Sequence, residues 1–108
     1  MADRIDGLVN GSQNPETDNR LVVASGEGEL KRGQLLKLDD GKLKKIATGD
    51  TPHSILRAGV DATDGDAPCS YYIKGAFNES FIDYGDGTAD EFREKLRAVG
   101  IDTFEPNR

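Results

Sequence analysis

The sequence predicts an α+β fold, in which a small β-rich domain carries one C-terminal α-helix and an extended N-terminal arm. Three observations predict it. Residues 55–77 read as an apolar strand, an acidic turn and an aromatic strand. Residues 34–47 contain an Asp-Gly pair between extended runs, which is typical of a β-hairpin. Residues 88–99 carry helix-capping signals and helical apolar spacing. At 108 residues, the chain fits one domain with one modest core.

The arm is expected to cover residues 1–19, and the folded body residues 20–108. Polar and turn-forming residues dominate the arm, so it cannot bury enough surface to offset the entropy lost on ordering. Its large apolar residues are Ile5, Leu8 and Val9. The arm is therefore either a disordered tail or a segment that becomes ordered on a partner.

The body is expected to begin with a short β-prone run from Arg20 to Ser25. Gly26 and Gly28 interrupt it. This glycine pair lacks the third glycine, the lysine and the following helix of a phosphate-binding loop, so we interpret it as a simple loop. A turn at residues 30–33 then leads into the hairpin.

In the hairpin, a two-residue loop at Asp40-Gly41 places Leu38 opposite Leu43. Strand side chains alternate between two faces, so one face should be dry and the other wet. The predicted apolar face consists of Leu36, Leu38 and Leu43. The predicted charged face consists of Lys37, Asp39, Lys42 and Lys44.

The central stretch predicts two neighbouring antiparallel strands, each with one buried face. The first runs from Ile55 to Val60, and the loop at residues 61–68 follows it. The first strand's apolar face would hold Leu56, Ala58 and Val60, and the second strand's would hold Cys69, Tyr71, Ile73 and Phe77. Gly75 falls on the second apolar face, where a glycine indicates a bulge or a close backbone approach.

The predicted helix runs from Thr88 to Val99. Thr88 is a good N-cap, and Glu91 three residues later would complete a capping box. The predicted buried stripe consists of Phe92, Leu96 and Val99. Gly100 is the expected residue after the helix, with Ile101 packing back on the last turn. Residues 102–108 are expected to form a short tail.

No catalytic residue, cofactor or metal site is predicted. The single cysteine, Cys69, cannot form an internal disulfide and is interpreted as buried core filler rather than a reactive thiol. The only histidine, His53, has no cysteine partner at a zinc-site spacing and is interpreted as a surface or loop residue. A Ser/His/Asp arrangement stays open, because geometry defines such triads. The aspartate-rich segments 61–66 and 83–87 lack the spacing of a calcium loop and are interpreted as turns.

Charge limits the partners that are expected. The chain has 14 Lys and Arg against 20 Asp and Glu, a formal net charge of −6. Such a surface predicts poor binding to nucleic acid and to anionic membranes. No apolar run approaches the length of a membrane span or of a signal peptide, so we expect a soluble protein made in a cytoplasm.

Several pieces, taken in order, resemble the head decoration proteins of tailed bacteriophages, which are the lambda-type capsid cement proteins. The matching pieces lie within residues 17–104, and the sequence departs from the family pattern at Ser54, Cys69 and Tyr71-Tyr72. The matching pieces are Leu21–Gly26, Leu30–Leu36, Gly41–Leu43, Ile55–Leu56, Val60–Thr63, Gly65–Asp66, Ile73–Glu79 and Leu96–Ile101.

The resemblance implies a β-tulip or barrel-like fold and a homotrimer at the threefold positions of an expanded icosahedral capsid. On the outer surface of the virion it would bind the major capsid protein and resist the pressure of packaged DNA. Two hypotheses follow for the residues. The arm would add a strand to the major capsid protein, using Ile5, Leu8, Val9, Arg20, Leu21, Val22 and Val23. The trimer interface would use Tyr71, Tyr72 and Phe77.

The alternative is a small β-domain of a phage particle that binds a ligand or a carbohydrate. Exposed aromatic residues in a groove would favour it, but aromatics are only 6% of the chain and tryptophan is absent. An enzyme would need converging titratable residues, which one histidine, one cysteine and scattered turn aspartates do not indicate.

Overall fold

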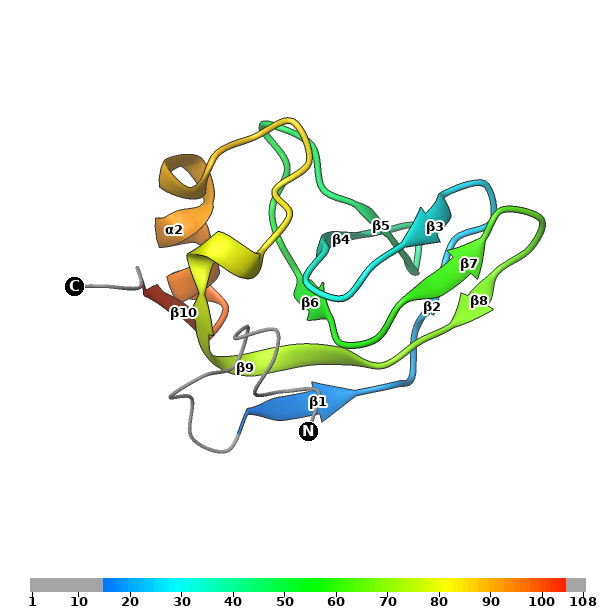
Figure 1. Ribbon diagram of the computed structural model, residues 1–108, viewed down its shortest axis with the longest axis horizontal. Helices are drawn as coiled ribbons and strands as arrows, with labels where there is room; N and C mark the ends of the chain where they lie inside the picture. Colours follow the sequence, from blue (N-terminus) through cyan, green and yellow to red (C-terminus); the bar gives the residue numbers. More distant parts are fainter. Residues whose placement is uncertain (1–14, 105–108) are drawn as a thin grey trace.

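The structure, a computed structural model, describes residues 15–104. Strands fill most of this range, and one α-helix lies near its C-terminal end (Figure 1). This confirms the prediction of a small β-rich domain with one C-terminal helix. In chain order the elements are β1 (Glu16–Asp18), β2 (Val22–Val23), β3 (Gly28–Leu30), β4 (Leu35–Asp39), β5 (Lys42–Lys45), β6 (Ser54–Leu56), β7 (Val60–Ala62), β8 (Ala67–Pro68), β9 (Tyr71–Asn78), the 3-10 turn η1 (Glu79–Phe81), α2 (Ala89–Ala98) and β10 (Ile101–Phe104).

One curled sheet holds most strands, in the order β1-β9-β6-β4-β5-β2-β8, and β10 pairs with β9 in parallel. A separate ribbon of β3 and β7 lies at the other end of the molecule from α2 (Figure 1). The short strand β6 is central, because it pairs antiparallel with β4 on one side and β9 on the other. The predicted antiparallel neighbours are therefore present as β6 and β9, with Ile55 opposite Tyr72.

The middle of the sheet is buried on both faces. In β4, β6 and β9, pairs of adjacent residues point to opposite faces, and both members are buried. Leu35, Ile55 and Tyr72 join one apolar cluster, whereas Leu36, Leu56 and Tyr71 join the other. The prediction of one buried face for each strand is therefore wrong at these positions.

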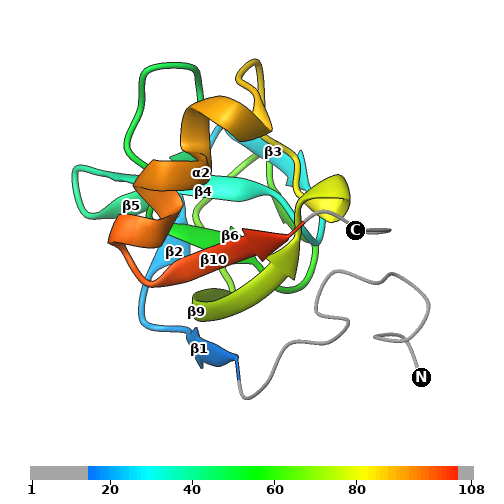
Figure 2. The ribbon, with the colours of Figure 1, turned by 90° about the vertical axis from the view of Figure 1, so that its left-hand side faces the viewer.

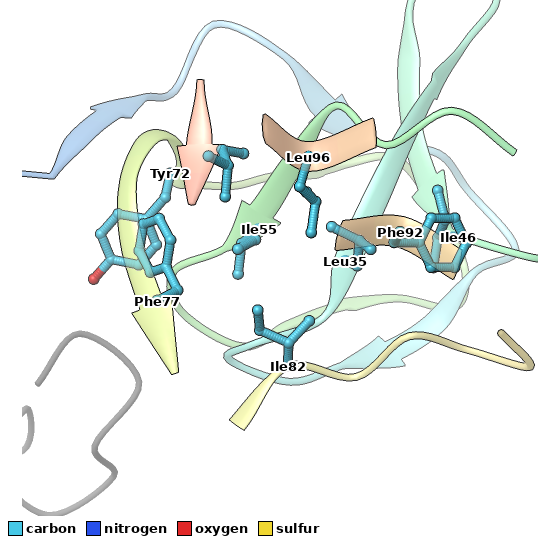
Figure 3. Close-up of a cluster of buried hydrophobic side chains, with 9 residues drawn as sticks. Leu35, Ile46, Ile55, Tyr72, Phe77, Ile82, Phe92 and Leu96 are labelled. Atoms are coloured by element: carbon cyan, nitrogen blue, oxygen red, sulfur yellow. The ribbon is translucent and has the colours of Figure 1, made fainter. Parts of the chain in front are cut away.

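The first cluster packs between the sheet, η1 and α2 (Figure 3). Figure 2 shows α2 lying beside β10, whose Ile101 is fully buried. The second cluster packs the opposite sheet face against β2, β3, β7 and β8. The first cluster holds Leu35, Ile46, Ile55, Tyr72, Phe77, Ile82, Phe92, Leu96 and Ile101. The second holds Val23, Leu30, Leu36, Leu43, Leu56, Ala62, Ala67, Cys69 and Tyr71.

The strand predicted from Ile55 to Val60 is broken. Residues 57–59 are exposed and separate β6 from β7, so Ala58 is not part of a buried face. The break lets β7 leave the main sheet and pair with β3, with Leu30 opposite Val60. Two short strands in two sheets therefore replace one long strand.

The hairpin has the predicted register, with Leu38 opposite Leu43. Asp40 and Gly41 both have positive φ, 53° and 78°, as a type I′ turn requires. Leu43 is fully buried, but Leu38 is 47% exposed, which corrects its placement in the core. Burial decreases along β4 towards the hairpin tip: Leu35 and Leu36 are buried, whereas Leu38 and Asp39 are exposed.

The helix is confirmed, with Thr88 as its N-cap and Gly100 in the left-handed region after it. Thr88 Oγ1 accepts a hydrogen bond from Glu91 N at 3.2 Å. The other half of the capping box is absent, because the Glu91 carboxylate accepts from the Thr48 hydroxyl and from Gly49 N instead. Val99 is 39% exposed rather than buried. The expected tail is also corrected, because residues 101–104 form β10.

Three residues of the expected arm belong to the sheet. Strand β1 (Glu16–Asp18) pairs antiparallel with β9, so these residues are paired with the body. Gly75 in β9 marks the predicted close approach, with φ 138°. A Cβ there would lie 3.0 Å from the Phe77 ring and 3.1 Å from Pro15 Cβ. Ile5, Leu8 and Val9 lie outside the described residues.

Candidate functional site

The three aromatic residues expected at a trimer interface are buried inside a single chain. Tyr71 and Phe77 are fully buried, and Tyr72 is 4% exposed. The hydroxyl groups of the two tyrosines also have hydrogen-bond partners within the chain. Tyr71 Oη accepts from Leu21 N, and Tyr72 Oη accepts from Arg32 Nη1, both at 3.1 Å. Because a second chain could not reach these rings, the assignment of Tyr71, Tyr72 and Phe77 as contact residues is corrected: they form the core.

Strand β2 cannot be the part of the chain that adds to a partner's sheet. Val23 is fully buried and pairs with Leu43 of β5 on one side and Ala67 of β8 on the other. Both edges of β2 at Val23 are therefore already paired with other strands of the same chain. This corrects the expectation that Val22 and Val23 take part in strand addition. Leu21 beside them is half-buried.

Arg20 lies on the surface and folds back on the strand before it. Its guanidinium contacts both carboxylate oxygens of Asp18, at 2.6 Å for Nη2 and 3.0 Å for Nε. The hydrogen bonds from Arg20 lower the pKa of Asp18 to about 2. This pair fixes the turn between β1 and β2 and leaves Asp18 charged at neutral pH.

Strand β1 does have a free edge. It pairs with β9 on one side, and no other strand within residues 15–104 pairs with its outer side. Exposed edge strands present backbone donors and acceptors to another chain. The edge is short, since β1 spans only Glu16–Asp18. Residues 1–14 precede it directly in the sequence.

An apolar groove lies between the hairpin, β9 and the end of α2. It has a volume of about 500 Å³. Leu38 and Val99 line it, and these are two of the three large hydrophobic side chains that are exposed within residues 15–104. The full lining is Leu38, Thr51, Pro52, His53, Ile73, Lys74 and Val99. Residues 51–53, which directly precede β6, contribute three of the groove's lining residues.

A second hollow continues the groove towards β1. The two share His53 and Ile73, and the second also contains Asp18, Arg20 and Leu21. The two hollows are therefore adjacent, with His53 and Ile73 lining both. The third large exposed hydrophobic residue, Phe81, lies outside both.

His53 is half-buried in the loop before β6, which agrees with its interpretation as a loop residue. Its Nδ1 lies 3.0 Å from Ser54 Oγ, and its ring centroid lies 5.9 Å from that of Tyr71. Burial lowers the pKa of His53 below its ordinary value. Ser54 is fully buried and Asp18 is held by Arg20, so this Ser-His pair does not form an accessible catalytic triad.

The remaining chemical candidates have structural roles. Cys69 is buried, its Sγ lies 3.5 Å from Leu21 O, and burial raises the pKa of the thiol. Asp61 accepts from both Thr63 N and Thr63 Oγ1, and Asp83 accepts from Gly85 N, which is turn chemistry. Within residues 15–104, no group of three or more His, Cys, Asp or Glu residues is placed to hold a metal ion.

The sequence did not predict the groove. Leu38 and Val99 follow the apolar spacing of their elements, so they were expected in the core. Spacing tells which face a residue lies on, but not whether a neighbouring element covers that face. Among the described residues no element covers Leu38 or Val99 fully, which depends on tertiary packing.

Comparison with known protein families and with curated proteins found no match. Among the described residues, α2 is the single α-helix, and it is too short and too polar to cross a bilayer.

Proposed function

We propose that this chain is a structural decoration protein of a tailed-phage head. It would bind the outer face of the expanded capsid as a trimer at threefold positions and stabilise the head against internal DNA pressure. The observation that supports this best is the position of β1. The N-terminal segment runs directly into an edge strand with a free side, so a partner strand bound there would continue the sheet of the body.

The contact would be strand addition to the major capsid protein. Main-chain hydrogen bonds supply affinity in this mode, and alternate side chains supply specificity. Strand β1 and the segment before it, with Ile5, Leu8 and Val9, would carry the contact. Arg20 is exposed at the end of β1 and could contact an acidic group on the partner. A segment that orders on binding loses entropy, so it would bind only where a matching edge is presented.

This proposal agrees with the charge and the packing of the body. An acidic surface is a poor partner for nucleic acid. Among residues 15–104, Phe81 is the one exposed Phe or Tyr side chain, and Tyr84 and Phe104 are partly buried. The described part of the body therefore lacks the cluster of exposed aromatic residues that would favour a carbohydrate-binding module. The ligand-binding alternative therefore has less support than the structural role.

The test is binding to empty heads of the encoding phage, prepared before and after expansion. The full chain should co-sediment with expanded heads and not with unexpanded ones. A chain that starts at Pro15 keeps β1 but loses the N-terminal segment, and it should bind expanded heads much more weakly. The triple variant Asn10→Ala, Ser12→Ala, Gln13→Ala keeps the apolar residues and serves as the control. Equal binding to both head forms, or unchanged binding of the shortened chain, would contradict the proposal.

Trimer formation is tested separately by light scattering. A mass of three chains in solution would show a trimer that forms before binding. On the head lattice, the binding stoichiometry should be three chains per threefold position. Replacement of Tyr71 or Phe77 should act through folding and not through selective loss of the trimer, because both side chains are already buried in one chain.

A further inference from the structure

We propose that, in the free protein, the N-terminal segment of the same chain binds in the groove lined by Leu38, Pro52, His53, Ile73, Lys74 and Val99. The segment is residues 1–14, and Ile5, Leu8 and Val9 would be the side chains that occupy the groove. This inference goes beyond the proposed function and does not depend on it, because it concerns the protein without any capsid.

The first argument is that residues 1–14 join the body at Pro15, close to the groove. Pro15 Cβ lies 3.1 Å from the position that a Cβ on Gly75 would take. The neighbouring residue, Lys74, lines the groove, and its side chain runs within 3.4 Å of the corresponding position at Gly100, beside Val99. The segment therefore starts next to the groove. Five residues lie between Val9 and Pro15. The six steps from Pro15 to Val9 span roughly 20 Å in an extended chain.

The second argument is chemical complementarity. Leu38 is 47% exposed and Val99 39% exposed in a chain whose other large apolar residues are mostly buried. The segment contains three large apolar residues, and their burial in the groove would remove apolar surface from water. Asp3, Arg4 and Asp6 lie within two residues of Ile5 and carry a net charge of −1, and Lys74 is the lysine of the groove lining. A groove of about 500 Å³ falls in the range of sites that hold a few side chains.

The third argument is tethering. A segment joined to the body by a short connection has an effective concentration on the order of millimolar. A contact that would be weak between separate molecules is then well populated. This favours the segment of the same chain over that of a second copy.

The test compares NMR spectra of the full chain and of the chain that starts at Pro15. Removal of the segment should shift the methyl signals of Leu38, Ile73 and Val99 and the ring signals of His53. The methyl signals of Leu56, which is fully buried in the second cluster, should stay in place and show that the fold is intact. Unchanged groove signals, or shifts confined to Phe81, would overturn the proposal.

Full-length variants identify the side chains responsible. The variant Ile5→Ser, Leu8→Ser, Val9→Ser should reproduce the spectrum of the shortened chain at the groove. The matched variant Asn10→Ala, Ser12→Ala, Gln13→Ala should keep the spectrum of the parent. If both variants keep the parent spectrum, the apolar residues do not occupy the groove and the proposal fails.

Dilution separates the same chain from a second copy. Binding within one molecule predicts groove signals that do not change with protein concentration. Groove signals that move towards those of the shortened chain on dilution would overturn the assignment to the same molecule.

Discussion

At the scale of single residues, the three tyrosines differ in what their hydroxyl groups contact. The hydroxyls of Tyr71 and Tyr72 accept hydrogen bonds from Leu21 N and Arg32 Nη1. Tyr84 Oη is buried and has no hydrogen-bond partner within residues 15–104. Its ring stacks on Phe92, with 6.1 Å between centroids and 7° between planes. Burial raises the pKa of Tyr84 well above its usual range, because a buried site disfavours the charged phenolate.

Replacement of Tyr84 by Phe should therefore stabilise the protein. An unsatisfied buried hydroxyl is unfavourable, and its removal should raise the free energy of unfolding by about 1 kcal/mol. Tyr71→Phe is the matched change, because it removes an acceptor that is in use and should lower the free energy of unfolding by about 1 kcal/mol. Urea denaturation followed by circular dichroism measures both. Destabilisation by Tyr84→Phe would show that the hydroxyl has a partner outside the described residues.

The hairpin turn provides a second test at this scale. Gly41 has φ 78°, and a Cβ there would meet nothing within 4 Å. Gly41→Ala should therefore cost about 1 kcal/mol through backbone conformation alone. Gly65 also faces open space but lies outside the left-handed region, so Gly65→Ala is the control and should be neutral or slightly stabilising. Thermal unfolding of the two variants distinguishes them, and equal effects would argue against the I′ turn.

The sequence predicted well those residues whose role depends on near neighbours. The Asp40-Gly41 turn and the Thr88 N-cap are local chemistry, and both are present. The sequence predicted poorly those residues whose role depends on distant elements. Whether Leu38 is covered depends on which elements pack over the end of β4, and whether Glu91 caps its own helix depends on the loop at Thr48.

At the scale of elements, adjacent apolar pairs were the overlooked signal. Period-two reasoning assigns one buried face to a strand, so only one residue of each pair was expected in the core. The pairs Leu35-Leu36, Ile55-Leu56 and Tyr71-Tyr72 are buried on both faces. Two consecutive large apolar residues in three separate strands indicate a sheet that is covered on both sides. The parallel strand β10 was missed because its residues pair with β9 and carry no alternating pattern of their own.

Glu79 holds three elements together. Its carboxylate accepts hydrogen bonds from Arg93 Nε at 3.1 Å and Nη2 at 2.9 Å in α2, and from Thr103 Oγ1 at 3.1 Å in β10. Arg93, and to a lesser degree Thr103, lowers the pKa of Glu79 below its ordinary value. The folded-state pKa is thus below the unfolded one. The stabilising contribution is present above the unfolded pKa of about 4.3 and is lost as the pH falls through the folded pKa.

The substitution Glu79→Gln should lower the free energy of unfolding at pH 7 by about 1 kcal/mol, since the 32% exposure of Arg93 leaves the pair partly screened. The difference from the parent should shrink as the pH falls below about 4. Urea denaturation at several pH values measures it. Glu94→Gln is the control, because Glu94 pairs with Arg97 on the surface and should matter much less. A difference that stays constant down to pH 3 would contradict this role of the ion pair.

At the scale of the whole molecule, the two apolar clusters share one sheet and should not unfold separately. Leu96 lies in the first cluster and Leu43 in the second, and both are fully buried. The backbone of β4, β6 and β9 supplies side chains to both clusters, so the loss of either cluster removes support from the same strands. A single cooperative unit is then expected, as for most domains of this size.

Leu96→Ala and Leu43→Ala should each lower the free energy of unfolding by about 2–5 kcal/mol and shift one calorimetric transition without splitting it. Phe81→Ala is the control, because Phe81 is 44% exposed and lies outside the groove, and its truncation should move the transition far less. If the clusters were independent, Leu43→Ala would produce an early transition that leaves the helix signal in circular dichroism unchanged. That result would mean that adjacent residues of one strand can lose their packing on one face while the other face stays folded.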